Sequence, residues 1–238
     1  MFKLKTNHIY GRNPVKEALL ADRVKEIFLT DNFSHREILD LISKKHIKTT
    51  IVSRRELDQS IDGVHQGVVA DIKEYQYSSY EEILKQCQNK KDAIILILDG
   101  INDPQNFGAI LRSADVFDVS GIILSKHEQV PLNATVAKTS AGAINYVPVC
   151  AVNNLNQTIE KLKKDGFWVV ASDGSGTYNY QDINYDFKVA LVIGSEGQGV
   201  SKLVLKNADY VIKIPQFGHV NSLNASVAAG ILLAKIRQ

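Results

Sequence analysis

The sequence contains few cysteines, and the two that it has lie far apart. Cys87 and Cys150 share no CxxC pattern within the 238 residues, which excludes a disulfide framework and argues against a zinc site. They indicate a reducing compartment, so we expect a cytoplasmic protein. The six histidines are scattered without the spacing of metal ligands, and we therefore expect no metal.

Long apolar runs are missing as well. No stretch approaches the roughly 20 apolar residues that a membrane-spanning helix needs. The N-terminal segment lacks the apolar core of a secretory signal. It is basic and has no acidic residue before Glu17, as in a transit peptide, but serine and arginine are too sparse there to favour that interpretation.

A strong excess of charge of one sign is also absent. The formal net charge is +2, and the small excess of lysine and arginine lies in the first third of the chain. Such a balance neither requires nor excludes a nucleic-acid partner. Any prediction of RNA binding therefore depends on motifs rather than on charge.

Residues 1–74 are predicted to form a small α/β unit. We expect a helix from Asn13-Pro14, because asparagine caps helices and proline fits the first turn. A second helix is expected after Ser34, which with Glu37 matches a capping box. The remaining expected elements are strands at 24–29, 49–52 and 68–71 and a short helix at 54–59.

Basic side chains cluster within this unit. They are Lys44, Lys45, Lys48, Arg54 and Arg55. A solvated surface is the first interpretation of such a cluster, and a face that contacts phosphates is the alternative.

A linker at 75–82 is expected to lead into a larger domain at 83–238. Ser79 with Glu82 forms another capping-box match at the start of a helix. The run Ala93–Leu98 is continuously apolar, as in a central strand of a parallel sheet. Strands and helices alternate after it, which predicts a doubly wound α/β sheet. The expected strands are 121–124, 146–149, 167–171, 190–193 and 211–214, and the helices are 109–117, 133–141, 155–164 and one from about Asn221.

The first candidate motif is the segment DPQNFG at 103–108 with Arg112. We expect Asn106 in a loop and Arg112 in the next helix, both facing the ends of the strands. Arginine offers five donors suited to phosphate, and asparagine offers a donor and an acceptor. A structural turn followed by a surface arginine explains this motif equally well.

The second candidate is GSEGQG at 194–199, directly after an apolar strand. Its order is G-x-x-G-x-G, which is the reverse of the dinucleotide fingerprint, and no Walker Gly-Lys-Ser/Thr follows. Dinucleotide and ATP binding are thus poorly supported. The glycines suit an adenosine-containing ligand held by backbone amides, and the alternative is a structural turn containing Glu196.

The third candidate lies at the start of the last helix. Leu223, Val227, Ile231 and Ala234 have helical spacing and predict its apolar face. Ser222 and Asn224 lie at the start of this helix, where they serve either as caps or as ligand contacts. Because both are neutral, neither is an obvious general base.

Together these stretches resemble the SpoU/TrmH branch of the SPOUT superfamily of RNA ribose 2′-O-methyltransferases. The three motifs of that family look like DPQNFGAILRSA, VIGSEGQGVS and IPQFGHVNSLNASVAAGI, and they cover about residues 93–238. The N-terminal IYGRNPVKEAL and HQGVVA resemble the substrate-binding domain of the RlmB subfamily, which methylates a guanosine in 23S-type ribosomal RNA.

The resemblance implies a fold, a cofactor and a site. The fold would combine an L30e-like N-terminal domain with a C-terminal domain that has a parallel sheet, a deep trefoil knot and a homodimer interface. The pocket for S-adenosylmethionine would be lined by Gly194, Ile214 and Leu223. The reactive site would contain Arg112, Asn106, Glu196, Ser222 and Asn224.

The implied reaction is methylation of a guanosine ribose 2′-hydroxyl in large-subunit ribosomal RNA. Transfer RNA is the second choice of substrate, and a non-catalytic RNA-binding or ribosome-assembly protein of the same fold is the alternative function. A dehydrogenase is disfavoured by the order of the glycines. Gln216 and Ala225 depart from the residues common in the family, but neither is an implied reactive group.

Overall fold

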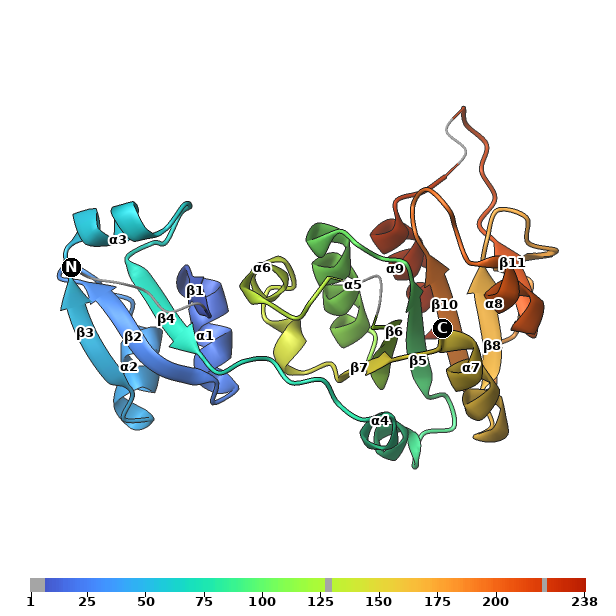
Figure 1. The fold of residues 1–238 in the computed structure, drawn as a ribbon, viewed down its shortest axis with the longest axis horizontal. Helices are drawn as coiled ribbons and strands as arrows, with labels where there is room; N and C mark the ends of the chain where they lie inside the picture. Colours follow the sequence, from blue (N-terminus) through green and yellow to red (C-terminus); the bar gives the residue numbers. More distant parts are fainter. Residues whose placement is uncertain (1–6, 127–129, 220–221) are drawn as a thin grey trace. The chain divides into compact units, whose positions relative to one another are not determined.

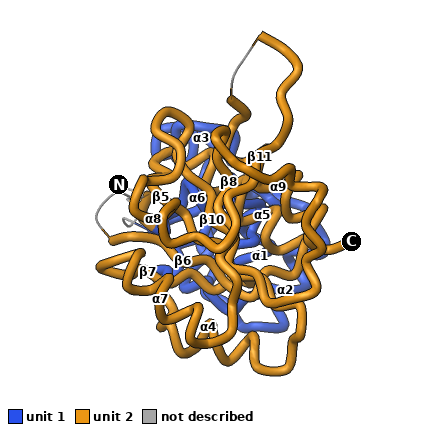
Figure 2. The backbone as a smooth tube through the Cα atoms, turned by 90° about the vertical axis from the view of Figure 1, so that its right-hand side faces the viewer, with its two compact units in different colours: residues 1–76, 132–145 blue, residues 77–131, 146–238 orange. Residues whose placement is uncertain are grey.

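The computed structural model describes residues 7–126, 130–219 and 222–238. Two compact units divide the chain: Met1–Gln76 with Leu132–Asn145, and Tyr77–Pro131 with Tyr146–Gln238 (Figures 1 and 2). The chain first passes from one unit to the other inside the expected linker. The segment 132–145, which we expected in the larger domain, groups with the first unit.

The first unit contains a mixed four-stranded sheet in the order β1-β4-β2-β3. Strand β4 runs antiparallel to both of its neighbours, and β2 pairs with β3 in parallel. Strand β1 is three residues long and was not predicted, because its short HIY sequence has no visible period. The elements are β1 (His8–Tyr10), α1 (Arg12–Leu20), β2 (Val24–Thr30), α2 (Arg36–Lys44), β3 (Lys48–Val52), α3 (Arg54–Ser60), β4 (Val68–Ile72), α6 (Ala134–Thr139) and the 3₁₀ turn Ala143–Asn145.

The second unit contains a seven-stranded sheet in the order β7-β6-β5-β10-β8-β11-β9, and all of its pairings are parallel. This confirms the predicted parallel α/β architecture. The strands are β5 (Ile94–Asp99), β6 (Gly121–Ser125), β7 (Val149–Val152), β8 (Trp168–Ser172), β9 (Tyr178–Asn179), β10 (Val189–Gly194) and β11 (Tyr210–Lys213). Strand order does not test the expected knot, which stays a prediction.

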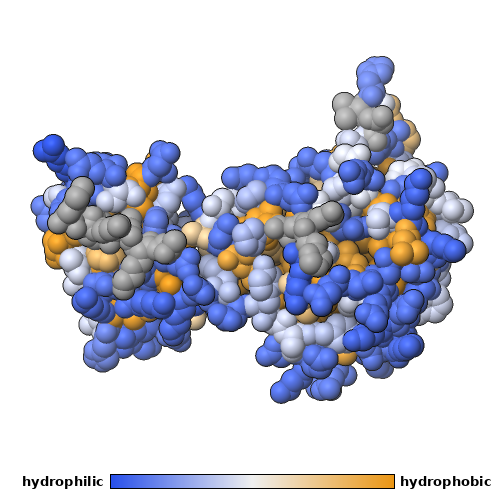
Figure 3. Space-filling view, viewed as in Figure 1, coloured by the Kyte–Doolittle hydropathy of each residue, from blue (hydrophilic) through white to orange (hydrophobic). Residues whose placement is uncertain are grey.

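Helices cover both faces of this sheet (Figure 1). Helices α4 (Tyr80–Cys87), α7 (Leu155–Lys164) and α8 (Lys202–Asn207) contribute to one buried core with β5, β8 and β10. Helices α5 (Pro104–Val116) and α9 (Ala225–Ile236) pack against each other, and α9 also contacts β10. Central strands buried on both faces explain why Ala93–Leu98 is apolar at every position. Hydrophilic residues cover most of the visible surface of each unit (Figure 3).

Several expected elements are shifted. Strand β7 begins at Val149, where we expected a strand to end, and helix α8 between β10 and β11 was not predicted. In the first unit α1 is capped by Gly11 rather than Asn13, so Asn13 and Pro14 both lie inside the first turn. In the described part of the chain, no helix is long and apolar enough to cross a bilayer.

The two capping-box signatures in the sequence have different outcomes. Ser79 caps α4: its hydroxyl accepts from the Glu82 N–H, and the Glu82 carboxylate accepts from the Ser79 N–H. Helix α2 instead begins after His35, whose side chain makes no capping hydrogen bond, so the Ser34 prediction was wrong. The real second capping box is Ser53 with Glu56, at the start of α3.

Ser79→Ala should therefore destabilise the second unit by about 1 kcal/mol. Ser34→Ala is the matched control, and it should change the free energy of unfolding by less than about 0.5 kcal/mol because Ser34 caps nothing. Urea denaturation followed by circular dichroism measures both. Equal losses for the two variants would contradict the assignment of the caps.

Candidate active site

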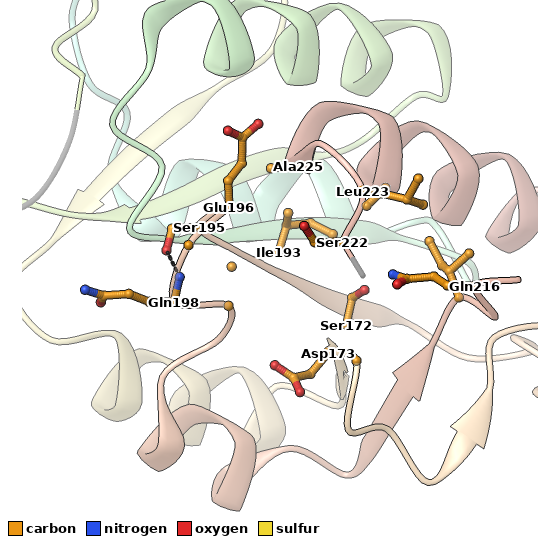
Figure 4. A pocket seen from close by; sticks show the side chains of 16 residues that line it. Ser172, Asp173, Ile193, Ser195, Glu196, Gln198, Gln216, Ser222, Leu223 and Ala225 are labelled. Atoms are coloured by element: carbon orange, nitrogen blue, oxygen red, sulfur yellow. Dashed lines mark hydrogen bonds between the residues drawn. The ribbon is translucent and has the colours of Figure 1, made fainter. Parts of the chain in front are cut away.

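The parallel strands of the second sheet all end at the same edge. The loops after β8, β10 and β11 and the start of α9 surround a cavity of about 290 Å³ (Figure 4). In open parallel sheets, ligands bind in the crevice at this edge. Five of the expected site residues line this cavity: Gly194, Glu196, Ile214, Ser222 and Leu223.

The glycine-rich turn after β10 folds back on itself. The Ser195 N–H donates to the Gly199 carbonyl at 3.2 Å, and the Gly199 N–H donates to the Ser195 carbonyl at 3.0 Å. A Cβ added to Gly194 would lie 2.1 Å from the Gly199 carbonyl carbon, so no side chain fits there. Gly199 has φ +66°, which favours glycine. Glycine at 194 and 199 is therefore required by the turn itself.

Two aspartates support this turn from neighbouring strands. The Asp99 carboxylate at the end of β5 accepts the Ser201 N–H at 2.8 Å. Asp173, after β8, accepts hydrogen bonds from the Ser175 N–H and hydroxyl at 2.9 and 2.6 Å. Burial opposes ionisation of Asp173, but these bonds and one from the Val200 N–H outweigh it and lower the pKa of this carboxyl. Asp173 lines the cavity and is ionised at neutral pH.

One closed hydrogen-bond triangle joins all three candidate motifs. The Asn106 Nδ2 donates to Glu196 Oε1 at 3.0 Å. The Asn224 Nδ2 donates to Asn106 Oδ1 at 2.8 Å and also to Glu196 Oε1. Residues separated by 118 positions in the chain thus share one polar network, beside the cavity that Glu196 lines.

The cap of α9 sets the orientation of the Asn224 amide. Asn224 is the N-cap residue, and its Oδ1 accepts the N–H groups of Ser226 and Val227 at 3.0 and 3.3 Å. Its amide NH₂ must then face Glu196 and Asn106. Asparagine here serves both as a helix cap and as a donor to the site, so the two interpretations of this motif do not exclude each other.

Helix α9 begins later than expected and buries a different face. It starts at Ala225, and the predicted starting point Asn221 lies outside the described residues. Its buried residues are Ala225, Ala229, Leu232 and Leu233, whereas Val227, which we expected in the core, is 48% exposed. The prediction failed because the helix is apolar on nearly every side, so spacing alone does not select a face.

Asn106 and Arg112 lie on one helix rather than on a loop and a helix. Helix α5 starts at Pro104 because Asp103 caps it, with its carboxylate accepting the N–H groups of Gln105 and Asn106. Asn106 is 9% exposed and belongs to the triangle. Arg112 is exposed and does not line the cavity. Among the described residues, none forms a hydrogen bond or ion pair with it, so its guanidinium is free to bind a ligand.

The contribution of β8 to the cavity was not predicted. Ser172, Asp173 and Gly174 line it, as do Gln216, Ala225 and Ala228. A signal for the first three was present, because they directly follow the strand predicted at 167–171 and parallel strands end at one edge. In the part of the chain that the structure describes, no group of three or more histidine, cysteine or acidic side chains is placed to hold a metal ion.

Comparison with known proteins identifies two family models in the chain. The SpoU rRNA Methylase family matches residues 93–234, and the RNA 2'-O ribose methyltransferase substrate-binding family matches residues 8–78. A Staphylococcus epidermidis protein described as a TrmH family tRNA/rRNA methyltransferase is 41% identical over 233 residues, covering 96% of this chain and 94% of that protein. A Bacillus subtilis protein with the same description, YacO, is 40% identical, covering 97% of this chain and 94% of its own length.

Solved structures match the fold over nearly the whole chain. The SpoU methyltransferase AviRb from Streptomyces viridochromogenes, in complex with the cofactor AdoMet, has a TM-score of 0.82 at 21% identity. That match covers 97% of this chain and 88% of AviRb. An AdoMet-bound rRNA methyltransferase from Sinorhizobium meliloti has a TM-score of 0.79 at 24% identity and covers 97% and 86% of the two chains.

Gly194→Ala should unfold or distort the glycine turn, because the added methyl group would meet backbone rather than a movable side chain. We expect a loss of stability of about 2 kcal/mol or more. Gly218→Ala is the control, since a Cβ there meets nothing within 4 Å. Thermal denaturation compares the two, and a Gly194→Ala protein as stable as the Gly218→Ala protein would refute the close approach.

Proposed function

The chain belongs to the SpoU rRNA Methylase family and is an RNA methyltransferase that uses S-adenosylmethionine. We propose that it methylates a guanosine ribose 2′-hydroxyl in large-subunit ribosomal RNA. The observation that carries the proposal is the triangle of Asn106, Glu196 and Asn224 at the rim of the cavity. It joins the three family motifs into one site, as a shared reaction centre requires. Transfer RNA is the second candidate substrate, and the curated relatives are named for both RNAs.

The lining of the cavity suits S-adenosylmethionine. Gly194, Ile214 and Leu223 would line it, largely through backbone groups and apolar surface. Two carboxylates, Asp173 and Glu196, also line it, and no lysine, arginine or histidine does so among the described residues. A negatively charged lining suits a sulfonium cation. When bound, the cofactor supplies a methyl group already activated for transfer.

The protein then has to position the ribose and stabilise charge on its hydroxyl oxygen. Arg112 is the group that we propose for both tasks. Its guanidinium is free, and its planar set of N–H donors suits a phosphate or an alkoxide. Arginine side chains stay protonated in proteins, so Arg112 is not the proton acceptor, and an RNA phosphate or water takes the proton. Asn106, Glu196, Ser222 and Asn224 complete the proposed reactive site, with Ser222 exposed at the cavity.

The RNA target follows from the acceptor, since a 2′-hydroxyl is what distinguishes RNA from DNA. The N-terminal motifs and the substrate-binding model at 8–78 support an RNA-contacting first unit.

We also propose a cytoplasmic homodimer formed through the second unit. Exposed apolar side chains on the paired helices α5 and α9, Val116 at 71% and Val227 at 48%, support an interface there.

Labelled S-adenosylmethionine and total RNA from cells that lack the homologous activity test the reaction. We expect label in large-subunit RNA as 2′-O-methylguanosine. Arg112→Ala should slow single-turnover transfer about 100-fold or more, as expected for loss of a group that stabilises developing charge. Lys164→Ala, an exposed change on α7, is the control and should transfer at the wild-type rate. Label in transfer RNA would overturn the substrate, and no label with cofactor still bound would favour the non-catalytic RNA-binding protein.

The charge of the cavity should make the protein distinguish the sulfonium cofactor from its neutral product, S-adenosylhomocysteine. Asp173→Asn should lower the ratio of the two affinities about fivefold, the order of magnitude for one weakly screened charge pair. Because the pKa of Asp173 is lowered, this carboxylate stays ionised in the wild type from about pH 5 to pH 8. Its contribution to the affinity ratio should be constant over that range and decline only as the pH falls towards the lowered pKa. Isothermal titration calorimetry measures the two affinities at each pH. An unchanged affinity ratio in Asp173→Asn would contradict the charge argument.

A further inference from the structure

A second cavity, of about 410 Å³, lies entirely within the first unit. Four loops at one edge of its sheet form it: those after β1, β2 and β3 and the one before β4. We call it the loop pocket. Most of its lining residues are polar or positively charged, and one of them, Phe33, has a flat phenyl ring. The lining residues are Arg12, Thr30, Asn32, Phe33, Ser34, Arg54, Val64, His65, Gln66 and Gly67.

The loops of this pocket are held in place by their own hydrogen bonds. The Arg12 N–H donates to Gln66 Oε1 at 2.8 Å, which connects the first loop to the last. The buried His65 ring accepts the Gly67 N–H on Nδ1 at 3.0 Å, so its Nε2 carries the proton and donates to Asp58 at 2.8 Å. Gly67 has φ +81°, and a Cβ on it would lie 2.7 Å from Thr30 Oγ1. The shape of the pocket is thus built before any ligand arrives.

The basic side chains of the first unit differ in whether they are engaged in close ion pairs. Lys45 pairs with Asp22 at 2.5 Å and Lys48 pairs with Glu26 at 2.9 Å, so both are engaged within the unit. Arg54 has only a 3.9 Å ion pair with Asp58 and is 76% exposed. No described residue forms a hydrogen bond or ion pair with the Arg12 guanidinium. The two arginines of the pocket are therefore available for an anion.

The aromatic ring of the pocket is placed to stack. Phe33 is half-buried, and its ring lies beside that of His35, with centroids 6.5 Å apart and planes 25° apart. Asn32, next to it, is exposed and offers an amide that can both donate and accept. A flat ring, an amide and two guanidinium groups, of which Arg54 makes only a long ion pair, surround a cavity of ligand size and match the base and the phosphates of one nucleotide.

We propose that the loop pocket binds an unstacked nucleotide from a single-stranded segment of the RNA substrate. Its base lies against Phe33, and its flanking phosphates contact Arg12 and Arg54. A base inside a duplex cannot reach such a pocket, whereas loops and bulges present splayed bases. This inference rests on the proposed function, because it names the kind of RNA structure that the first unit selects.

Binding to a fluorescein-labelled RNA hairpin, and to a blunt duplex of the same stem, tests the proposal by anisotropy. The wild type should prefer the hairpin, and Phe33→Leu should weaken hairpin binding about tenfold while leaving duplex binding unchanged. Arg54→Gln should reduce the slope of log affinity against log salt by about 0.7, the value for one phosphate contact with a single strand. Arg55→Gln, the adjacent residue outside the pocket, is the matched control and should leave the slope unchanged.

Ultraviolet crosslinking to the hairpin adds a readout that does not depend on a variant. Crosslinked nucleotides should map to the peptide that contains Phe33. Wild-type behaviour of Phe33→Leu and Arg12→Gln, or crosslinks only in the second unit, would overturn the loop pocket while methyl transfer continued. Absence of transfer to any RNA, with hairpin preference intact, would instead contradict the proposed function and leave this inference standing.

Discussion

The hydrogen-bond triangle of Asn106, Glu196 and Asn224 is the interaction on which the second unit's site depends. Each corner comes from a different strand–loop–helix segment and lies in a backbone feature that other contacts fix. Asn224 caps α9, Asn106 lies in the first turn of α5, and Glu196 lies within a turn that closes on itself. A parallel sheet makes this possible because it brings the ends of β5 and β10 to one edge.

Close backbone approach is the second constraint, and it explains the glycines better than ligand binding alone. Gly194 and Gly199 are needed so that the turn can pair with itself, and the resulting turn forms one wall of the cavity. The structural-turn and ligand-binding interpretations of GSEGQG therefore describe the same feature. Asp99 and Asp173 hold this turn from two neighbouring strands, which links the shape of the cavity to the order of the sheet.

Much of the fold was predictable because its signals are local. Buried parallel strands are apolar throughout, and the Ser79 cap follows from two residues three positions apart. The predictions failed where the local sequence is compatible with more than one structure. Helix α9 has no polar side that would select its buried face, and β1 is too short to show a period. The site residues could be named from motifs, but the triangle and the exposed position of Arg112 depend on contacts between distant segments. Asp173 directly follows a predicted strand, but no motif marked it, and its hydrogen bond with Val200 joins segments that are distant in the sequence.

The most direct test of the central claim is a double-mutant cycle on single-turnover methyl transfer with Asn106→Ala, Glu196→Ala and the double variant. If the two side chains act as one positioned unit, the double variant should be about as slow as the slower single variant, because either change already breaks the triangle. Independent effects that multiply in the double variant, or rates near wild type in both single variants, would contradict a shared reaction centre.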